Sequence, residues 1–280
     1  MTRPVRPGPP PLDRQGVRPV LRPIITGDDF GFDVAVNSAI VLSFQQGLIS
    51  HASLMVNLDH FEDACHLVQV HRLQGRIGLH LNLTEGVPLT GDVRGTPLCA
   101  GGRFVPPDRL RHYRFLSPST KRAVASEVTA QIRAARSAGI ALTHLDSHNH
   151  IHTIPSLARV IAEVARAHGI PRVRPARTCG GERGMVRWLF DSRCNRLLER
   201  LQLKRVGHFG SIDDLLAIRQ HEGVAAGMCD EAMTHPRLSD DGHAVMDAPF
   251  GPLAARVRTL KTASLTEVGG SELSLAEPVG

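Results

Sequence analysis

Aromatic side chains, paired cysteines and long apolar runs are all scarce in this sequence. Its 280 residues include one Trp and one Tyr, which leaves little surface on which nucleic-acid bases could stack. The five cysteines are widely spaced and form no CxxC pair, so neither a disulfide framework nor a cysteine-ligated zinc site is expected. No apolar run approaches the roughly 20 residues of a membrane-spanning helix, so no stable membrane insertion is expected.

A secretory signal is also lacking, because no apolar segment follows the basic first residues. We therefore expect a cytoplasmic protein. The net charge of +6 suggests a nucleic-acid partner, but residues 1–23 hold five arginines against one aspartate. The rest of the chain carries only about +2, which argues against nucleic-acid binding.

The two ends of the chain differ in composition from the middle. Residues 1–21 are rich in Pro and Arg, and we expect a disordered tail there. Residues 264–280 are polar and small and predict a flexible C-terminal tail. Between them, residues 22–263 show no linker or internal repeat and are expected to form a single domain.

Short apolar runs alternate with amphipathic stretches through the middle of the chain. Strands are predicted over residues 22–27, 51–57, 76–83, 141–151, 172–176 and 225–235. Helices are predicted over residues 34–47, 61–72, 117–139, 155–167, 186–201 and 253–262. Repeated strand–helix units indicate an α/β fold, either a closed or distorted (β/α) barrel or an open doubly wound sheet. No GxGxxG motif opens a helix, and in either fold functional side chains gather at the C-terminal ends of the strands.

Two adjacent aspartates follow the first predicted strand. Asp28 and Asp29 stand where that strand ends, in the segment TGDDFG. One of them could cap the following helix. Alternatively, because both can reach a common site where a strand ends, one could bind a cation while the other handles a proton.

Histidines gather at two further strand ends. His80 lies in GLHLNLT, where a hydrogen-bonded core histidine is the more common interpretation. The segment THLDSHNHIH holds a run of histidines with one aspartate. Four of its residues share one face in strand geometry, namely Asp146, His148, His150 and His152. Convergent histidines with a carboxylate indicate an open hydrolytic metal site, although the pattern leaves open which histidines bind the metal.

Three later residues are weaker candidates. His235 precedes a proline after a late strand, where a turn histidine is the ordinary interpretation. Arg174 and Arg177 follow the strand after the histidine run. They could hold an anionic or carbonyl group, or simply be surface charges.

Together the segments TGDDFG, GLHLNLTEG, THLDSHNHIH and the late THP resemble, in order, the motifs of the YdjC-like carbohydrate deacetylases. That family includes chitooligosaccharide deacetylases and deacetylase-like proteins of hopanoid biosynthesis. The resemblance covers roughly residues 22–262 and implies a single distorted (β/α) barrel of the polysaccharide-deacetylase type. It also implies one divalent metal ion, magnesium or zinc, at the C-terminal strand ends.

The resemblance assigns roles to individual residues. Asp29, His80 and His148 match the metal ligands of the family. Asp28 matches the general base, and His235 matches a late histidine that would act as the acid. Asp146, His152 and Arg174 are expected to support these residues or contact the substrate, and His152 is the second choice for a metal ligand. The family's histidine run is often HHH, whereas Asn149 stands in the middle here and leaves His148 in place.

These roles predict a metal-dependent hydrolase that removes an N-acetyl group from an amino sugar or small glycoside. A metal-dependent phosphoesterase on the same barrel and a non-catalytic sugar-binding relative are the alternatives. The expected partner is a small N-acetylated sugar, and the sequence leaves open whether the protein forms a homo-oligomer. Candidate acceptors include a chitooligosaccharide, a lipid-linked sugar and an antibiotic intermediate.

Overall fold

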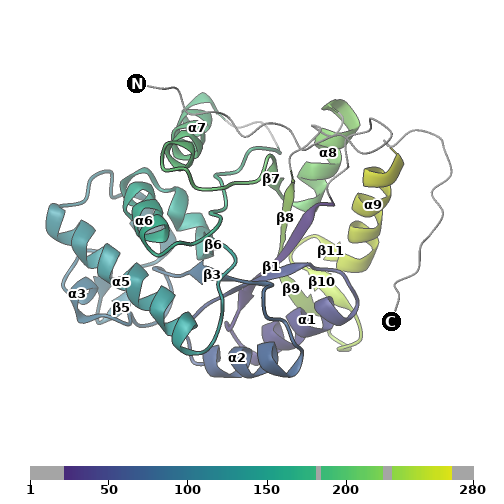
Figure 1. Cartoon of the computed structure of the whole chain (residues 1–280), viewed down its shortest axis with the longest axis horizontal. Helices are drawn as coiled ribbons and strands as arrows, with labels where there is room; N and C mark the ends of the chain where they lie inside the picture. The colour runs from purple at the N-terminus through teal and green to yellow at the C-terminus, as the bar shows by residue number, and fades with distance from the viewer. Residues whose placement is uncertain (1–21, 181–183, 223–228, 267–280) are drawn as a thin grey trace.

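Six parallel strands form a curled sheet in the middle of the molecule (Figure 1). The computed structural model describes residues 22–180, 184–222 and 229–266. In sheet order the strands are β6 (Leu145–Ser147), β3 (Ile77–Leu81), β2 (His51–Leu54), β1 (Ile24–Phe30), β8 (Glu231–Thr234) and β7 (Phe209–Gly210). Because every neighbouring pair is parallel, the C-terminal ends of the strands lie along one rim.

Irregular backbone contacts join the two edges of this sheet. Beyond β6, Leu145 bridges Val173, and the Val173 N–H donates to the carbonyl of Lys204 at 3.1 Å. The Thr178 N–H donates to the carbonyl of Phe209, in β7, at 3.1 Å. The sheet is therefore a distorted barrel, as the sequence predicts, and the predicted strand over residues 172–176 contributes only isolated bridges to it.

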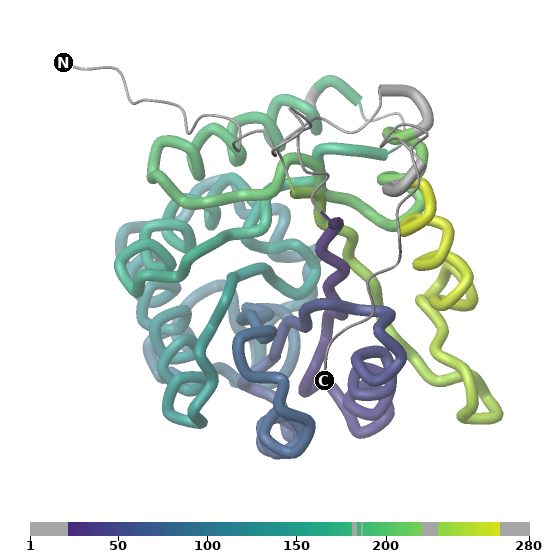
Figure 2. The backbone as a smooth tube through the Cα atoms, turned by 45° about the vertical axis from the view of Figure 1, so that its right-hand side comes forward, coloured from purple at the N-terminus to yellow at the C-terminus, as the bar shows by residue number. Residues whose placement is uncertain are grey.

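Helices surround the outside of the sheet (Figures 1 and 2). The longer ones are α1 (Val34–Gln45), α2 (Phe61–Val70), α5 (Pro118–Ser137), α6 (Pro155–Ala167), α7 (Met185–Arg200), α8 (Ile212–Glu222) and α9 (Leu253–Thr266). The segment between β3 and α5 folds into four short elements, α3 (Gly91–Arg94), β4 (Cys99–Ala100), β5 (Arg103–Phe104) and α4 (Pro107–Arg111). A small antiparallel sheet follows β8 and consists of β9 (Pro236–Leu238), β10 (Val245–Asp247) and β11 (Gly251–Pro252).

Helix starts follow the local signals of the sequence. The Asp33 side chain accepts a hydrogen bond from the Val36 N–H at the start of α1. Ser117 caps α5 in the same way, and Pro118 occupies the first turn, where no backbone donor is needed. The predicted start of α6 at Pro155 is confirmed.

Strand β3 illustrates how the barrel separates apolar from polar side chains. All of its residues are buried. Ile77, Leu79 and Leu81 belong to the hydrophobic core, whereas Gly78 and His80 alternate with them and face other polar groups. A polar interior at the C-terminal rim is what the predicted site requires.

Of the single strand predicted over residues 141–151, only Leu145–Ser147 is a strand, and the prediction is wrong on both sides of it. Beyond Ser147 the chain enters the 3₁₀ segment η1 (His148–Thr153), in which Asn149 and His150 adopt φ values of 55° and 54°. The four residues expected on one strand face therefore do not share one. Two hydrogen bonds stabilise the turn, because the Ser147 hydroxyl accepts from the His152 N–H at 3.0 Å and the Thr153 hydroxyl donates to the His150 carbonyl at 2.9 Å.

Helix α9 continues to Thr266, three residues past the expected end of the domain. The N-terminal tail expected over residues 1–21 and most of the C-terminal one lie outside the described residues. Within the described ranges, no helix combines the length and apolarity needed to cross a membrane.

Candidate active site

A bulge at the end of β1 turns two neighbouring carboxylates into the barrel. Gly27 pairs with Ala52, and Phe30 pairs with Leu54. Between these two pairs β1 therefore contains one more residue than β2. Asp29 takes a φ of 71°, which is uncommon outside glycine and is typical of functional sites. On a regular strand Asp28 and Asp29 would face opposite sides, whereas here both are buried in the interior.

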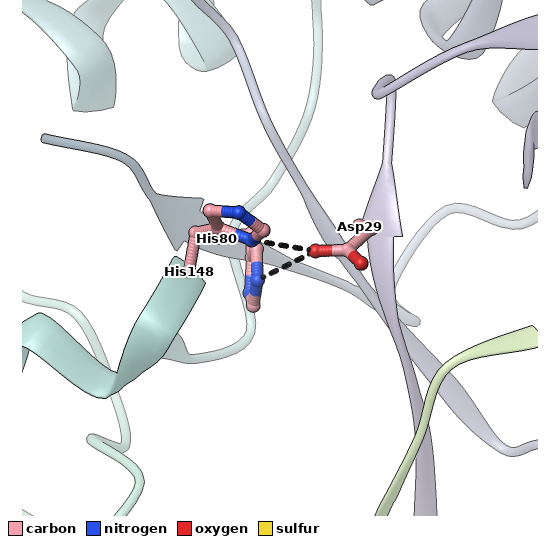
Figure 3. A group of neighbouring side chains, drawn as sticks. All are labelled: Asp29, His80 and His148. Atoms are coloured by element: carbon pink, nitrogen blue, oxygen red, sulfur yellow. Dashed lines mark hydrogen bonds and ion pairs between the residues drawn. The ribbon is translucent and has the colours of Figure 1, made fainter. Parts of the chain in front are cut away.

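Asp29 meets two histidines from neighbouring parts of the rim (Figure 3). Its Oδ1 lies 2.8 Å from Nδ1 of His148, at the start of η1, and 3.2 Å from Nε2 of His80, on β3. The candidate ligand atoms of the three residues all lie within 4.8 Å of one another. A divalent cation with bonds of about 2.1 Å would hold adjacent ligands roughly 3 Å apart, so the donor set and its spacing fit such an ion.

Ionisation of the Asp29 carboxyl is strongly favoured. Burial alone would raise its pKa, but hydrogen bonds with His148 and His80 outweigh burial and hold the pKa well below its usual range. A second cation is also close, because a guanidinium nitrogen of Arg237 lies 3.3 Å from Asp29 Oδ2. Asp29 is therefore an anionic group in contact with two imidazoles and a guanidinium.

His80 is oriented by a carboxylate on its other nitrogen. Its Nδ1 lies 2.8 Å from Asp146 Oδ1, and the Ser53 hydroxyl donates to Asp146 Oδ2 at 2.6 Å. Burial opposes protonation of His80, but Asp146 and then the two aspartates of β1 raise its pKa to about 10. A carboxylate behind a metal-binding imidazole is the usual way to fix its ring orientation, and a bound cation would displace the Nε2 proton.

A fully buried arginine connects the carboxylates behind the site. Arg174 donates two hydrogen bonds to Asp28, at 2.7 and 2.8 Å, which makes a bidentate pair. The same guanidinium contacts Asp146 at 2.7 Å and Glu231 at 2.9 Å. Arg174 is too deeply buried to be a surface charge, and its role as a support of the site stays a prediction.

The two other acidic clusters of the described chain are ion-paired rather than open. Asp28, His80 and Asp146 form one, and His144, Asp146 and Glu231 form the other. Arg174 contacts members of both. Because a guanidinium already neutralises them, we interpret these clusters as structural networks, and the candidate metal site is the cluster of Asp29, His80 and His148.

His152 uses its ring nitrogens in hydrogen bonds outside the candidate metal cluster. Its Nδ1 is hydrogen-bonded to the Ser147 hydroxyl at 2.5 Å, and its Nε2 lies 3.1 Å from the Arg174 carbonyl. Both ring nitrogens are therefore occupied by other partners. Burial lowers the pKa of His152 to about 4, so its imidazole is neutral near pH 7.

Two further histidines near the rim are His150 and His235. The Nδ1 of His150 is buried, and no hydrogen-bond partner for it occurs among the described residues. Burial, followed by repulsion from neighbours that include His152 and His235, lowers the pKa of His150 well below its usual range. The His235 N–H donates to Asp247 Oδ1 at 2.8 Å, which anchors the backbone just after β8.

Asn149 and Arg177 have contact partners outside the candidate metal cluster. Asn149 does not join the histidines, because its side-chain amide donates to the Thr84 hydroxyl at 3.1 Å. Arg177 pairs with Asp214 and does not contact the carboxylates of the site. The interruption of the histidine run at Asn149 therefore falls outside the Asp29, His80 and His148 set.

A family model described as YdjC-like protein matches residues 22–263. The chain belongs to the YdjC-like family. Its curated relatives include a carbohydrate deacetylase of Brevibacillus brevis, 33% identical over 223 residues that make up 78% of this chain and 82% of the relative. Another is a carbohydrate deacetylase of Vibrio vulnificus strain YJ016, 32% identical over 247 residues, 88% of each chain.

A solved structure shares the fold of this YdjC-like chain. It is described as a putative cellobiose-phosphate cleavage protein from Enterococcus faecalis V583, with a TM-score of 0.63 at 20% identity. The match covers 88% of this chain and 92% of that chain. At this level of identity the likeness concerns the fold alone.

Sequence reasoning missed three residues of the YdjC-like site. Glu231 carried a usable signal, since a charged residue inside an apolar strand must find a partner. Arg237 follows His235 by two positions and had no distinguishing feature. Ser53 is a small residue in a strand, and only the structure reveals its hydrogen bond to Asp146.

Proposed function

We propose that this protein is a metal-dependent carbohydrate N-deacetylase that hydrolyses the acetamide of an amino sugar or small glycoside. The observation that carries the proposal is the pair of inward-facing carboxylates at the β1 bulge. Asp29 lies against His80 and His148, while the adjacent Asp28 is held by Arg174. The carbohydrate deacetylases among the relatives support the same reaction class.

Asp29, His80 and His148 would hold the divalent ion. Such an ion, zinc or magnesium, polarises a carbonyl and lowers the pKa of a bound water. Mixed nitrogen and oxygen donors suit zinc well, and the oxygen ligand also accommodates magnesium. His80 is pre-oriented for this role by Asp146 behind its Nδ1.

Asp28 is the proposed general base. The attacking water gives its proton to this carboxylate, whose position is fixed by two hydrogen bonds from Arg174. His235 is the proposed acid that protonates the leaving amine, and it lies after the C-terminal end of β8, on the same rim. Removal of such a proton-transfer group typically costs about 10²- to 10⁴-fold in rate.

The alternative functions make different demands on the site. A phosphoesterase typically uses two metal ions and more carboxylates, whereas the open cluster here consists of one carboxylate and two imidazoles. A sugar-binding relative without activity would have no use for Asp28 beside a ligand. Both alternatives are therefore less well supported than deacetylation.

The decisive experiment measures acetate release from a panel of N-acetylated amino sugars and oligosaccharides. Metal-loaded and chelator-stripped protein are compared side by side, and bound metal is counted by mass spectrometry. We expect release from at least one substrate only when metal is present. Phosphate release from phosphoesters without acetate release would favour the phosphoesterase instead.

The variant Asp28→Asn tests the assigned base. We expect kcat to fall by about 10²- to 10⁴-fold while the metal content stays the same. Asp108→Asn is the matched control, because that aspartate is exposed on α4. Equal turnover by the Asp28→Asn variant would exclude Asp28 as the base.

A further inference from the structure

Helix α7 exposes several large apolar side chains near its start. Met185 is 76% exposed, Trp188 60%, and Leu189 and Phe190 about 40% each. Apolar side chains scattered singly on a surface are ordinary, but a contiguous group marks an interaction site. Met185, Trp188 and Leu189 follow one another at three- and four-residue spacing and form a single patch, whereas Phe190 lies on another side of the helix.

The second half of α7 is basic and borders a groove. The groove lies between α6 and α7, has a volume of about 490 Å³ and extends from Thr153, at the end of η1, along both helices. Four arginines line it, namely Arg159, Arg193, Arg196 and Arg200. Its apolar lining includes Ala158, Leu197 and Phe190, and no carboxylate lines it.

These arginines are available for an external anion. The acidic residues of α7 are already used, since Asp191 pairs with Arg187 and Glu199 pairs with Arg205. Within the described ranges, Arg193, Arg196 and Arg200 form no ion pair with a carboxylate. Arg159 makes only an exposed pair with Glu163 at 3.2 Å, which contributes little.

Met185 and Leu189 lie on the same side of the helix as the three arginines of its second half. Met185, Leu189 and Arg193 follow one another at four-residue spacing, and Arg196 and Arg200 continue the face. Phe190 lines the groove together with the arginines. One partner must therefore offer both an apolar surface and negative charge.

An isologous contact with a second copy fits this face poorly, because it would bring two arginine clusters together. Nucleic acid would satisfy the arginines but would leave the leucine and methionine without a partner. An anionic bilayer supplies phosphates for arginine and an interfacial region for Trp, Phe and Leu at the same depth.

We propose that α7 docks this protein on the surface of a bilayer that contains anionic phospholipids. Arg193, Arg196 and Arg200 bind lipid phosphates, and the patch around Trp188 enters the interfacial region. The docking is peripheral and reversible, and it does not depend on the proposed enzymatic function. It places η1, which carries His148, beside the bilayer.

The test uses the full chain, in which Trp188 is the only tryptophan. Its fluorescence is recorded during titration with vesicles of phosphatidylglycerol and phosphatidylcholine, and with vesicles of phosphatidylcholine alone. We expect a blue shift with the anionic vesicles and quenching by brominated lipid. The arginines of residues 1–23 could bind the same vesicles, but binding through them alone would leave the emission of Trp188 unchanged.

Two variants with matched controls locate the contact. Replacing Arg193, Arg196 and Arg200 by Gln should weaken vesicle binding by about a hundredfold. The control replaces Lys121, Arg122 and Arg133 by Gln, which removes the same charge from exposed positions of α5. Leu189→Ser, in the patch that contains Trp188, should reduce the blue shift, whereas Leu89→Ser, at a 42% exposed position away from α7, should not.

Four outcomes would overturn the proposal. They are vesicle binding without a shift of Trp188 emission, equal losses in the arginine variant and its control, equal binding to neutral vesicles, and no vesicle binding at all. In the last case, DNA binding lost on replacement of the α7 arginines would indicate a nucleic-acid surface. Self-association abolished by Leu189→Ser would indicate a dimer face.

Discussion

At the scale of single residues, the site separates groups that can bind a cation from groups that support them. Asp29, His80 and His148 point their donor atoms at a common centre, whereas His152 has both ring nitrogens in other hydrogen bonds. We therefore predict that His148→Ala abolishes stoichiometric metal binding and that His152→Asn retains it. Metal content after dialysis against a weak chelator, measured by mass spectrometry, checks both variants. The reverse pattern would make His152 the ligand.

Arg237 influences the same centre by its charge. Its guanidinium lies 3.3 Å from Asp29 Oδ2 and would repel a divalent cation bound to that carboxylate. We expect Arg237→Gln to tighten metal binding by roughly tenfold in a competition titration with a fluorescent chelator. Arg258→Gln, at an exposed position of α9, removes the same charge and should have no effect. Weaker binding in the Arg237 variant would mean that Arg237 positions Asp29 and does not compete for it.

The sequence could predict which residues lie close together but not which partners each side chain contacts. Asp28 and His80 lie near the C-terminal ends of β1 and β3, which share one rim, so their proximity is expected from the fold class alone. The different partners of Asp28 and Asp29 depend on a bulge and on one φ of 71°. Neither feature has a signature in the two-residue pattern Asp-Asp.

At the scale of elements, β3 and β6 are joined by a packed histidine as well as by backbone hydrogen bonds. A Cβ added to Gly78 would lie 2.3–2.5 Å from ring atoms of His144, whose Nε2 is hydrogen-bonded to the Ser53 hydroxyl at 3.0 Å. His144 is fully buried, so its ring cannot move into solvent. The glycine in GLHL is therefore required by packing, although its backbone conformation is ordinary.

We predict that Gly78→Ala lowers the free energy of unfolding by about 1–3 kcal/mol. The denaturant midpoint of the metal-free protein measures this directly. The control is Gly95→Ala, because a Cβ there meets no atom within 4 Å. If both variants unfold at the wild-type midpoint, the contact between Gly78 and His144 is not restrictive.

The elements that sequence periodicity predicted well are those with many buried apolar side chains. Helices α1, α5 and α6 begin within a residue of the predicted starts, since Ser117 and Pro155 mark two of them locally. The segment after Ser147 was predicted wrongly because alternating histidines imitate a strand of period two. Left-handed conformations at Asn149 and His150 break that period and move His148 beside Asp29.

At the scale of the whole molecule, buried ion pairs link segments that are far apart in the sequence. Glu231 on β8 accepts hydrogen bonds from Arg172 and Arg174, which flank the residue that bridges β6. It also accepts one from the Thr26 hydroxyl on β1. The contact spans the interior between the two halves of the curled sheet. No local pattern could reveal this pairing, because its partners lie 57 and 59 residues apart along the chain.

The ion pairs of Glu231 make the stability of the protein depend on pH. Burial would raise the pKa of Glu231, but Arg174 and Arg172 outweigh it and lower the pKa from its ordinary value of 4.5 to about 2. A carboxyl whose pKa is lower in the folded state stabilises it fully above about pH 4.5, and this contribution is lost as the pH falls toward 2. The contribution is on the order of 3 kcal/mol.

We predict that wild-type protein loses stability more steeply than Glu231→Gln between pH 5 and pH 2.5, approximately the window set by that pKa. The variant starts less stable at pH 7, because the two arginines lose a charged partner, but it has no carboxyl to titrate. Urea midpoints across the pH range give both slopes. Glu163→Gln, in an exposed pair on α6, should follow the wild-type curve. Parallel curves for wild type and Glu231→Gln would show that the interior pairing does not set the acid limit, and the many other carboxylates would then have to account for it.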